Sequence, residues 1–148
     1  MGETGPAAPD GLAAPERETR GPGGRGVLVV DDEPAVRHLV QSVLRSAGYA
    51  VTTAAGGREA LRAIYGESAT PGLVVTDLDM PGMSGVELAT RLTVDRPGVR
   101  IVLMTSDVES ADRARARPFV AAVLIKPFTA SDLRDVVRSV LGEPAPAS

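Results

Sequence analysis

Short apolar segments that end abruptly in acidic side chains limit most strongly how this chain can fold. Residues 27–30 are all Val or Leu and run directly into Asp31 and Asp32, and residues 73–75 are followed closely by Asp77 and a Pro-Gly turn. Continuous apolar runs of this length, bounded by turn residues, are typical of strands buried on both faces. Open α/β sheets place their functional sites at the carboxyl ends of such strands. We therefore expect these three carboxylates at one edge of a buried sheet.

Two further apolar segments end in polar groups. Residues 101–104 run into Thr105, and residues 123–125 run into Lys126, the one lysine among 16 basic residues. Because every other basic residue except the histidine is arginine, the single lysine indicates a site that needs a compact ammonium rather than a planar guanidinium. Thr105 and Lys126 join the acids as candidate site residues.

Helical patterns alternate with the apolar segments. We expect strands at residues 27–30, 50–53, 73–77, 101–105 and 123–126, and helices at residues 34–47, 58–65, 84–95, 110–117 and 129–141. Five strand-helix units in about 117 residues predict an α/β fold, a doubly wound five-stranded parallel sheet with helices on both faces.

Two of these helices carry specific expectations. In the first, the spacing of Val36, Leu39, Val40 and Leu44 predicts an inward apolar stripe. The helix at residues 110–117 offers little beyond alanine to bury, so we expect it to be weakly packed.

Composition limits the organisation and the class of protein. Residues 1–25 and 143–148 are rich in Gly, Pro and Ala and are interpreted as disordered tails around one domain at residues 26–142. A net charge of −3 with dispersed basic residues argues against direct nucleic-acid binding. The chain has no cysteine, no apolar run near the ~18 residues of a membrane span and no signal-peptide pattern. We expect no membrane association and a cytoplasmic location.

Three carboxylates brought close together repel one another unless a cation lies among them. Mg²⁺ suits one to three carboxylates, with water, carbonyl and phosphate oxygens as its other ligands. Beside a metal and an ammonium, Asp77 can attack phosphorus and form an acyl phosphate. Lys126 and the Thr105 hydroxyl would then hold the transferred oxygens.

Each motif alone also has a structural interpretation. Asp31 and Asp32 could be only an N-cap before Pro34, and Asp77 could lie in a turn with incidental acids. Thr105 could be a strand-end hydroxyl, and Lys126 a solvated charge. Four such coincidences at the same ends of different strands are improbable, so we favour the functional interpretation.

Taken in order, four motifs resemble the receiver domain of bacterial response regulators. They are Val-Val-Asp-Asp-Glu-Pro, Thr-Asp-Leu-Asp-Met-Pro-Gly-Met-Ser-Gly, Leu-Met-Thr-Ser and Ile-Lys-Pro-Phe. The resemblance covers about residues 26–142 and implies a flavodoxin-like fold. The Lys-Pro-Phe-Thr ending and the last helix are similar to stand-alone receivers or those associated with hybrid sensor kinases.

The resemblance implies a role for each candidate. Asp77 would be the phosphoacceptor, Asp31 and Asp32 the acids that hold Mg²⁺, and Asp79 a ligand through its backbone carbonyl. Thr105 would move onto the phosphoryl group and Lys126 would pair with it. The donor would be a phosphohistidine on a histidine kinase or phosphotransfer protein, and the signal would leave through an unknown downstream protein. The chain would catalyse only its own phosphorylation and dephosphorylation.

The sequence departs from the family pattern near its output region. Val123 stands where the family often has an aromatic side chain that rotates with the threonine, and residues 119–121 replace the usual Gly-Ala. A β-branched side chain has a restricted χ1 and lacks the reach of a ring. We expect the output to depend instead on the loop after Thr105 and on the helix at residues 110–117.

Two other functions stay open. A haloacid-dehalogenase-like phosphatase also uses Asp-x-Asp after an apolar strand, with a hydroxyl and a lysine, but it begins with that motif, whereas here Asp31 and Asp32 come first. A phosphorylation-independent receiver-like interaction module usually lacks an acid or the lysine, and this chain has them all.

Overall fold

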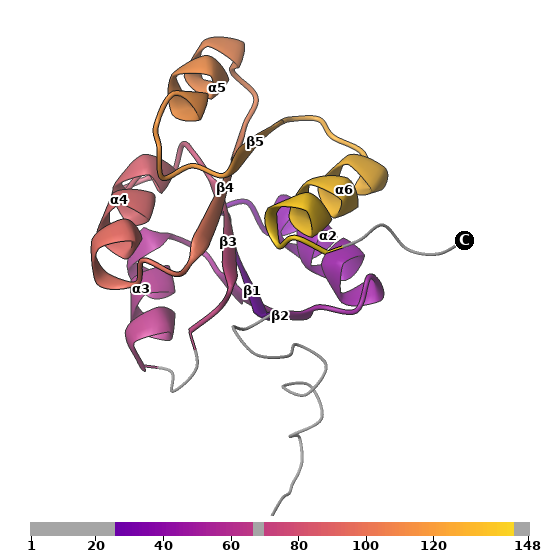
Figure 1. Cartoon of the computed structure of the whole chain (residues 1–148), viewed down its shortest axis with the longest axis horizontal. Coiled ribbons are helices and arrows are strands. Elements are labelled where there is room, and N and C mark those ends of the chain that lie inside the picture. The colour runs from indigo at the N-terminus through magenta and orange to yellow at the C-terminus, as the bar shows by residue number, and fades with distance from the viewer. Residues whose placement is uncertain (1–25, 67–69, 144–148) are drawn as a thin grey trace, which may run out of the picture.

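The computed structural model describes residues 26–66 and 70–143, which form one parallel sheet covered by helices on both faces (Figure 1). The strands are β1 (Gly26–Val30), β2 (Ala50–Ala54), β3 (Leu73–Asp77), β4 (Arg100–Thr105) and β5 (Ala122–Ile125). The helices are α2 (Pro34–Ser46), α3 (Gly57–Gly66), α4 (Gly85–Asp95), α5 (Val108–Arg115) and α6 (Ala130–Val140). The strand order is β2-β1-β3-β4-β5, so the predicted fold class is confirmed.

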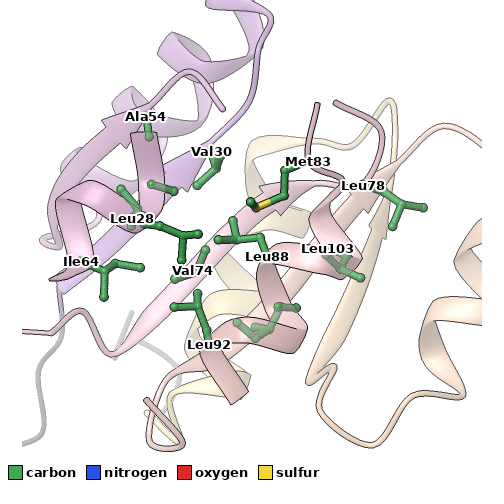
Figure 2. Close-up of a cluster of buried hydrophobic side chains, with 14 of the residues drawn as sticks. Leu28, Val30, Ala54, Ile64, Val74, Leu78, Met83, Leu88, Leu92 and Leu103 are labelled. Atoms are coloured by element: carbon green, nitrogen blue, oxygen red, sulfur yellow. The ribbon is translucent and has the colours of Figure 1, made fainter. Parts of the chain in front are cut away.

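One apolar core lies between the sheet and helices α3 and α4. Leu28 of β1 and Val74 of β3 point to this face, where Ile64, Leu88 and Leu92 of the two helices pack against them (Figure 2). All five side chains are at most 1% exposed. This core therefore holds α3 and α4 on one face of the sheet.

A second core lies on the opposite face, because alternate residues of a strand point to opposite sides. Val29 of β1 and Val75 of β3 pack there against Val40 of α2 and against Leu133 and Val137 of α6. Every strand of the sheet centre is thus buried on both faces, which explains its unbroken apolar sequence.

Side-chain caps fix where two of the helices begin. Ser84 and Thr129 each accept a hydrogen bond from the backbone N–H three residues on, and the Glu87 and Asp132 carboxylates accept one from the cap residue's N–H. These reciprocal bonds satisfy backbone donors that the first turn leaves without partners. The predicted starts of α4 and α6 are confirmed.

One expectation for the first helix is wrong, and one alternative interpretation of its start is excluded. Leu39 is 54% exposed rather than inward, whereas Val40 and Leu44 are fully buried and Val36 packs, partly buried, against the same core. The N-cap of α2 is Glu33, which makes no side-chain cap bond, so Asp31 and Asp32 are not its capping residues.

The boundaries differ slightly from the sequence-based ones. Helix α5 begins at Val108, two residues earlier than expected, because the Asp107 side chain accepts a hydrogen bond from the N–H of Ser110. Glu143, assigned from sequence to the tail, accepts a 2.6 Å hydrogen bond from the Tyr49 hydroxyl. The tails predicted at residues 1–25 and 144–148 lie outside the described residues. Within the described ranges, no helix is long and apolar enough to cross a membrane.

Candidate functional site

The candidate residues gather at one edge because adjacent strands end there. Asp31 follows β1, Asp77 ends β3, Thr105 ends β4 and Lys126 follows β5. These strands are consecutive neighbours in the sheet and all run parallel. The predicted convergence of the strand ends is therefore confirmed.

Lys126 lies between two buried carboxylates. Its Nζ donates to Asp77 Oδ1 at 3.1 Å and to Asp31 Oδ2 at 3.3 Å. Asp31 is fully buried and Asp77 is 8% exposed. The Lys126 N–H also donates to the Thr105 carbonyl at 2.8 Å, which holds its backbone against β4. The ammonium therefore belongs to the site and is not a solvated surface charge.

The acidic cluster leaves some of its oxygens without a protein donor. Asp31, Asp32 and Asp77 each place a carboxylate oxygen within 4.8 Å of the others. Both oxygens of Asp31 are engaged, one by Lys126 and the other by the N–H of Glu33 at 2.9 Å. Within the described part of the chain, Asp77 Oδ2 and the Asp32 carboxylate accept no hydrogen bond. These are the acceptors available to a cation.

The charges of the site shift its pKa values. Burial raises the pKa of Asp77, the hydrogen bond and charge of Lys126 oppose this, and the charges of Asp31 and Asp32 add to the rise. Burial lowers the pKa of Lys126, but the hydrogen bond and charge of Asp77, helped by Asp31, outweigh it and leave that pKa above its usual value. A single ammonium thus compensates only part of the negative charge.

Thr105 connects the site to helix α5. Its side chain is buried, and its Oγ1 accepts a 3.1 Å hydrogen bond from the N–H of Asp107, the N-cap of α5. The hydroxyl is thus engaged by the start of α5, and its predicted role at a phosphoryl group stays a prediction.

Asp79 lies in the loop after β3, with an exposed side chain. The preceding residue, Leu78, is fixed by two backbone bonds, from its N–H to the Met104 carbonyl and from the Gly85 N–H to its own carbonyl, both at 2.8 Å. The loop therefore leaves the sheet in a defined direction. Metal binding by the Asp79 carbonyl stays a prediction.

Arg37 is a site-bordering residue that the sequence interpretation missed. Its guanidinium donates to the Asp31 carbonyl at 2.7 Å. A cation in the first turn of a helix is disfavoured by the helix dipole, so its position at the start of α2 was an available signal. Arg37 ties α2 to the segment that presents Asp31 and Asp32.

Gly85 permits a close approach behind the site. A Cβ at this position would collide with the backbone carbonyl oxygen of Asp77 and would lie 3.0 Å from Leu78 Cα. The first turn of α4 therefore packs directly on the backbone that carries the Asp77 side chain. Only glycine fits here without moving that backbone.

The donor set suits magnesium. The available ligands are carboxylate oxygens on a fixed sheet edge, and hard divalent cations prefer oxygen ligands of this kind. The chain has no cysteine, and its only histidine, His38, is exposed on α2. The residues present therefore fit Mg²⁺, and the roles of Asp31, Asp32 and Asp77 as its ligands stay predictions.

Comparisons with known proteins agree on one family. The family model of the response regulator receiver domain matches residues 27–138. The chain is 33% identical over 116 residues to sporulation initiation phosphotransferase F of Bacillus subtilis, covering 78% of this chain and 92% of that protein. It is 38% identical over 87 residues to the probable transcriptional regulatory protein TcrX of Mycobacterium tuberculosis, covering 59% of this chain but only 36% of that protein.

Solved structures show the same likeness. Response regulator TrrA of Thermotoga maritima, determined in complex with Mg²⁺-BeF, matches with a TM-score of 0.70 and 31% identity, covering 78% of this chain and 98% of that one. Chemotaxis response regulator CheY4 of Vibrio cholerae matches with a TM-score of 0.69 and 30% identity, covering 79% and 98%. Together with the acidic strand ends, these matches show that the chain belongs to the response regulator receiver domain family of two-component systems.

Proposed function

We propose that this receiver domain is the phosphoacceptor of a two-component phosphorelay, with Asp77 taking a phosphoryl group from phosphohistidine. The observation that carries the proposal is the ion pair of Lys126 with buried Asp77 and Asp31. This ion pair uses one carboxylate oxygen of Asp77 and leaves the other without a donor among the described residues. The Asp32 carboxylate, which also accepts no hydrogen bond from them, lies close by. A purely structural ion pair would not need Asp32.

The transfer would proceed by attack of an Asp77 carboxylate oxygen on phosphorus. The bond between phosphorus and the imidazole nitrogen breaks, and its electron pair stays on the imidazole, which takes up a proton. Lys126 Nζ balances negative charge on the transferred oxygens, and the Thr105 hydroxyl can donate to one of them. Asp31, Asp32, Asp77 and the Asp79 carbonyl would hold magnesium, which would supply Lewis-acid stabilisation of the phosphoryl charge.

The partners follow from this chemistry. The donor is a histidine kinase or a histidine phosphotransfer protein, and the readout is a change of contact with a downstream protein in the cytoplasm. The domain catalyses only the gain and loss of its own phosphoryl group, so we do not class it as an enzyme. Its resemblance to TrrA, determined with Mg²⁺-BeF, supports a magnesium-dependent site.

Phosphorylation with acetyl phosphate tests the proposal. With magnesium present, intact-protein mass spectrometry should show one added phosphoryl group, and Asp77→Asn should show none. Asp112→Asn is the matched control, because it changes an exposed acid on α5 outside the site, and it should still be labelled. Labelling of Asp77→Asn to the wild-type extent would refute Asp77 as the acceptor.

The same experiment separates the alternatives. A phosphorylation-independent interaction module would remain unlabelled by acetyl phosphate and by a phosphorylated histidine phosphotransfer protein. A haloacid-dehalogenase-like phosphatase would hydrolyse p-nitrophenyl phosphate with many turnovers, whereas we expect none from this chain.

A further inference from the structure

A groove lies between helices α4 and α5, beside the loop that follows β3. It has a volume of about 240 Å³ and is open to solvent. Its apolar lining is formed by Leu78, Val86 and Ala114, and its polar wall by Ser110 and Arg113 of α5 and by Arg117 just after that helix. We refer to these six residues as the α4–α5 groove. None of them has a role in the phosphotransfer proposed above.

Helix α5 packs on the sheet with small side chains, which leave the groove beside it unfilled. Ala111 and Ala114 are its buried residues, and α5 makes its main contacts with β4 and β5. In Figure 1, α5 stands apart from α4 at the edge of the molecule.

The wall of the groove carries two positive charges. Hydrogen bonds from Ser110, and to a smaller extent the charge of Arg113, lower the pKa of nearby Asp107, but Arg113 forms no ion pair with that carboxylate. Arg113 lies on α5 and Arg117 directly after the C-cap residue of α5, and both line the groove. Arg113 donates to the hydroxyl of Ser110, and neither arginine has a carboxylate partner among the described residues. Arg115 differs, because it pairs with Asp112 at 3.0 Å and does not line the groove.

The occupant must match both the charge and the size of the groove. Exposed guanidinium groups bind carboxylates through paired N–H donors, and the apolar lining suits an aliphatic side chain. The volume is below the roughly 300–1,000 Å³ of small-molecule and cofactor sites. Two arginines in a chain of net charge −3 are too few for a nucleic-acid surface.

We propose that the α4–α5 groove binds a short acidic segment of a partner protein. Carboxylates of the segment pair with Arg113 and Arg117, and a neighbouring aliphatic side chain packs on Leu78 and Val86. Asp79, on the rim, is the one acid that lines the groove, so the lining keeps a net positive charge. This interaction does not require phosphorylation of Asp77, so it goes beyond the proposed function.

Fluorescence anisotropy with a labelled octapeptide of alternating Glu and Leu tests the proposal. We expect saturable binding by the full chain, and about tenfold weaker binding for Arg113→Gln or Arg117→Gln, the loss of one charge-assisted contact. Arg115→Gln is the matched control on the same helix and should bind as the wild type does. Circular dichroism should show all three variants folded, because each arginine is exposed.

Two further probes separate a docking groove from a simple anion site. A peptide with Ser in place of Leu should bind more weakly, and inorganic phosphate at the peptide concentration should not displace the Glu-Leu peptide. Equal binding of the Ser peptide, displacement by phosphate, or an equal loss in Arg115→Gln would overturn the proposal. The absence of saturable binding would overturn it as well.

Discussion

Asp77 is the side chain whose environment is least favourable to its own charge. Burial and two neighbouring carboxylates raise its pKa, and Lys126 only partly offsets them. Burying like charges together costs free energy that the fold supplies elsewhere. The site therefore suits a ligand that brings positive charge, and without that ligand the arrangement lowers the stability of the domain.

We predict that Asp77→Asn stabilises the ligand-free domain. The substitution removes a buried negative charge but leaves Lys126 paired with Asp31. The expected gain in the free energy of unfolding is about 1 kcal/mol, an ordinary size for one substitution. Urea unfolding in the presence of a metal chelator measures it.

The pH dependence gives a second readout of the same variant. Because the folded-state pKa of Asp77 lies above its usual value of 3.8, folding favours the protonated form. Stability should fall as pH rises from the unfolded pKa through the folded one. The gap between Asp77→Asn and wild type should therefore widen over this range, and an unchanged gap would contradict the prediction. Asp79→Asn, at an exposed position, serves as the control.

Local sequence was enough to identify the central side chains of the site. Asp31, Asp77 and Lys126 each end an apolar run, and strand ends at one edge of a parallel sheet must meet. Arg37 was missed because its bond to the Asp31 carbonyl depends on how α2 leaves the sheet. A cation at the start of a helix was a signal in the sequence, but the sequence does not show which backbone group that cation reaches.

Among the helices, α5 is the one best suited to move. Its buried side chains are alanines, and its N-cap, Asp107, donates its N–H to Thr105 Oγ1. A Thr105 hydroxyl that turns toward a phosphoryl group must release this bond. Elements with few buried apolar contacts shift at low free-energy cost, so the start of α5 is the expected route of output.

We predict that beryllofluoride with magnesium changes backbone NMR shifts most strongly at residues 105–117. Val123→Ala should preserve these changes, because Val123 is a half-buried β-branched side chain without the reach of a ring. Asp107→Ala should alter them, because it removes the carboxylate that caps α5. Shift changes that centre on Val123 and bypass α5 would show that the output runs through β5 instead.

The helices show what periodicity can and cannot predict. The stripe of α2 was identified correctly except at Leu39, which lies at its border and is exposed. Periodicity gives the direction of a helix face, but the width of the buried part depends on the shape of the surface it meets. The α4–α5 groove was equally absent from the sequence pattern, because its shape depends on how far apart the two helices pack on the sheet.

For the domain as a whole, ligand binding and folding are linked. A cation that binds only the folded chain stabilises it by RT ln(1 + [L]/Kd). The three carboxylates of the site lie on segments that follow or end β1 and β3, the central strands of the sheet. Magnesium would therefore raise the stability of the entire fold.

We predict that MgCl₂ at ten times its Kd stabilises the wild type by about 1.4 kcal/mol. For a domain of this size that corresponds to roughly 5 °C in Tm. Asp32→Ala should lose most of this increase, while Asp112→Ala, which removes an exposed acid on α5, should keep it. Thermal unfolding with MgCl₂ and with chelator measures both, and a full magnesium response in Asp32→Ala would contradict the proposed ligand.

The packing of α4 on the Asp77 backbone affects how mutational scans of this domain should be interpreted. Gly85 contacts no reacting atom, yet any side chain there pushes on the carbonyl of the nucleophile's own residue. A variant selected for abundance alone could recover by shifting that backbone and still lose phosphotransfer. Scoring expression and signalling separately would show that substitutions at Gly85 give a protein that is stable but inactive in phosphotransfer.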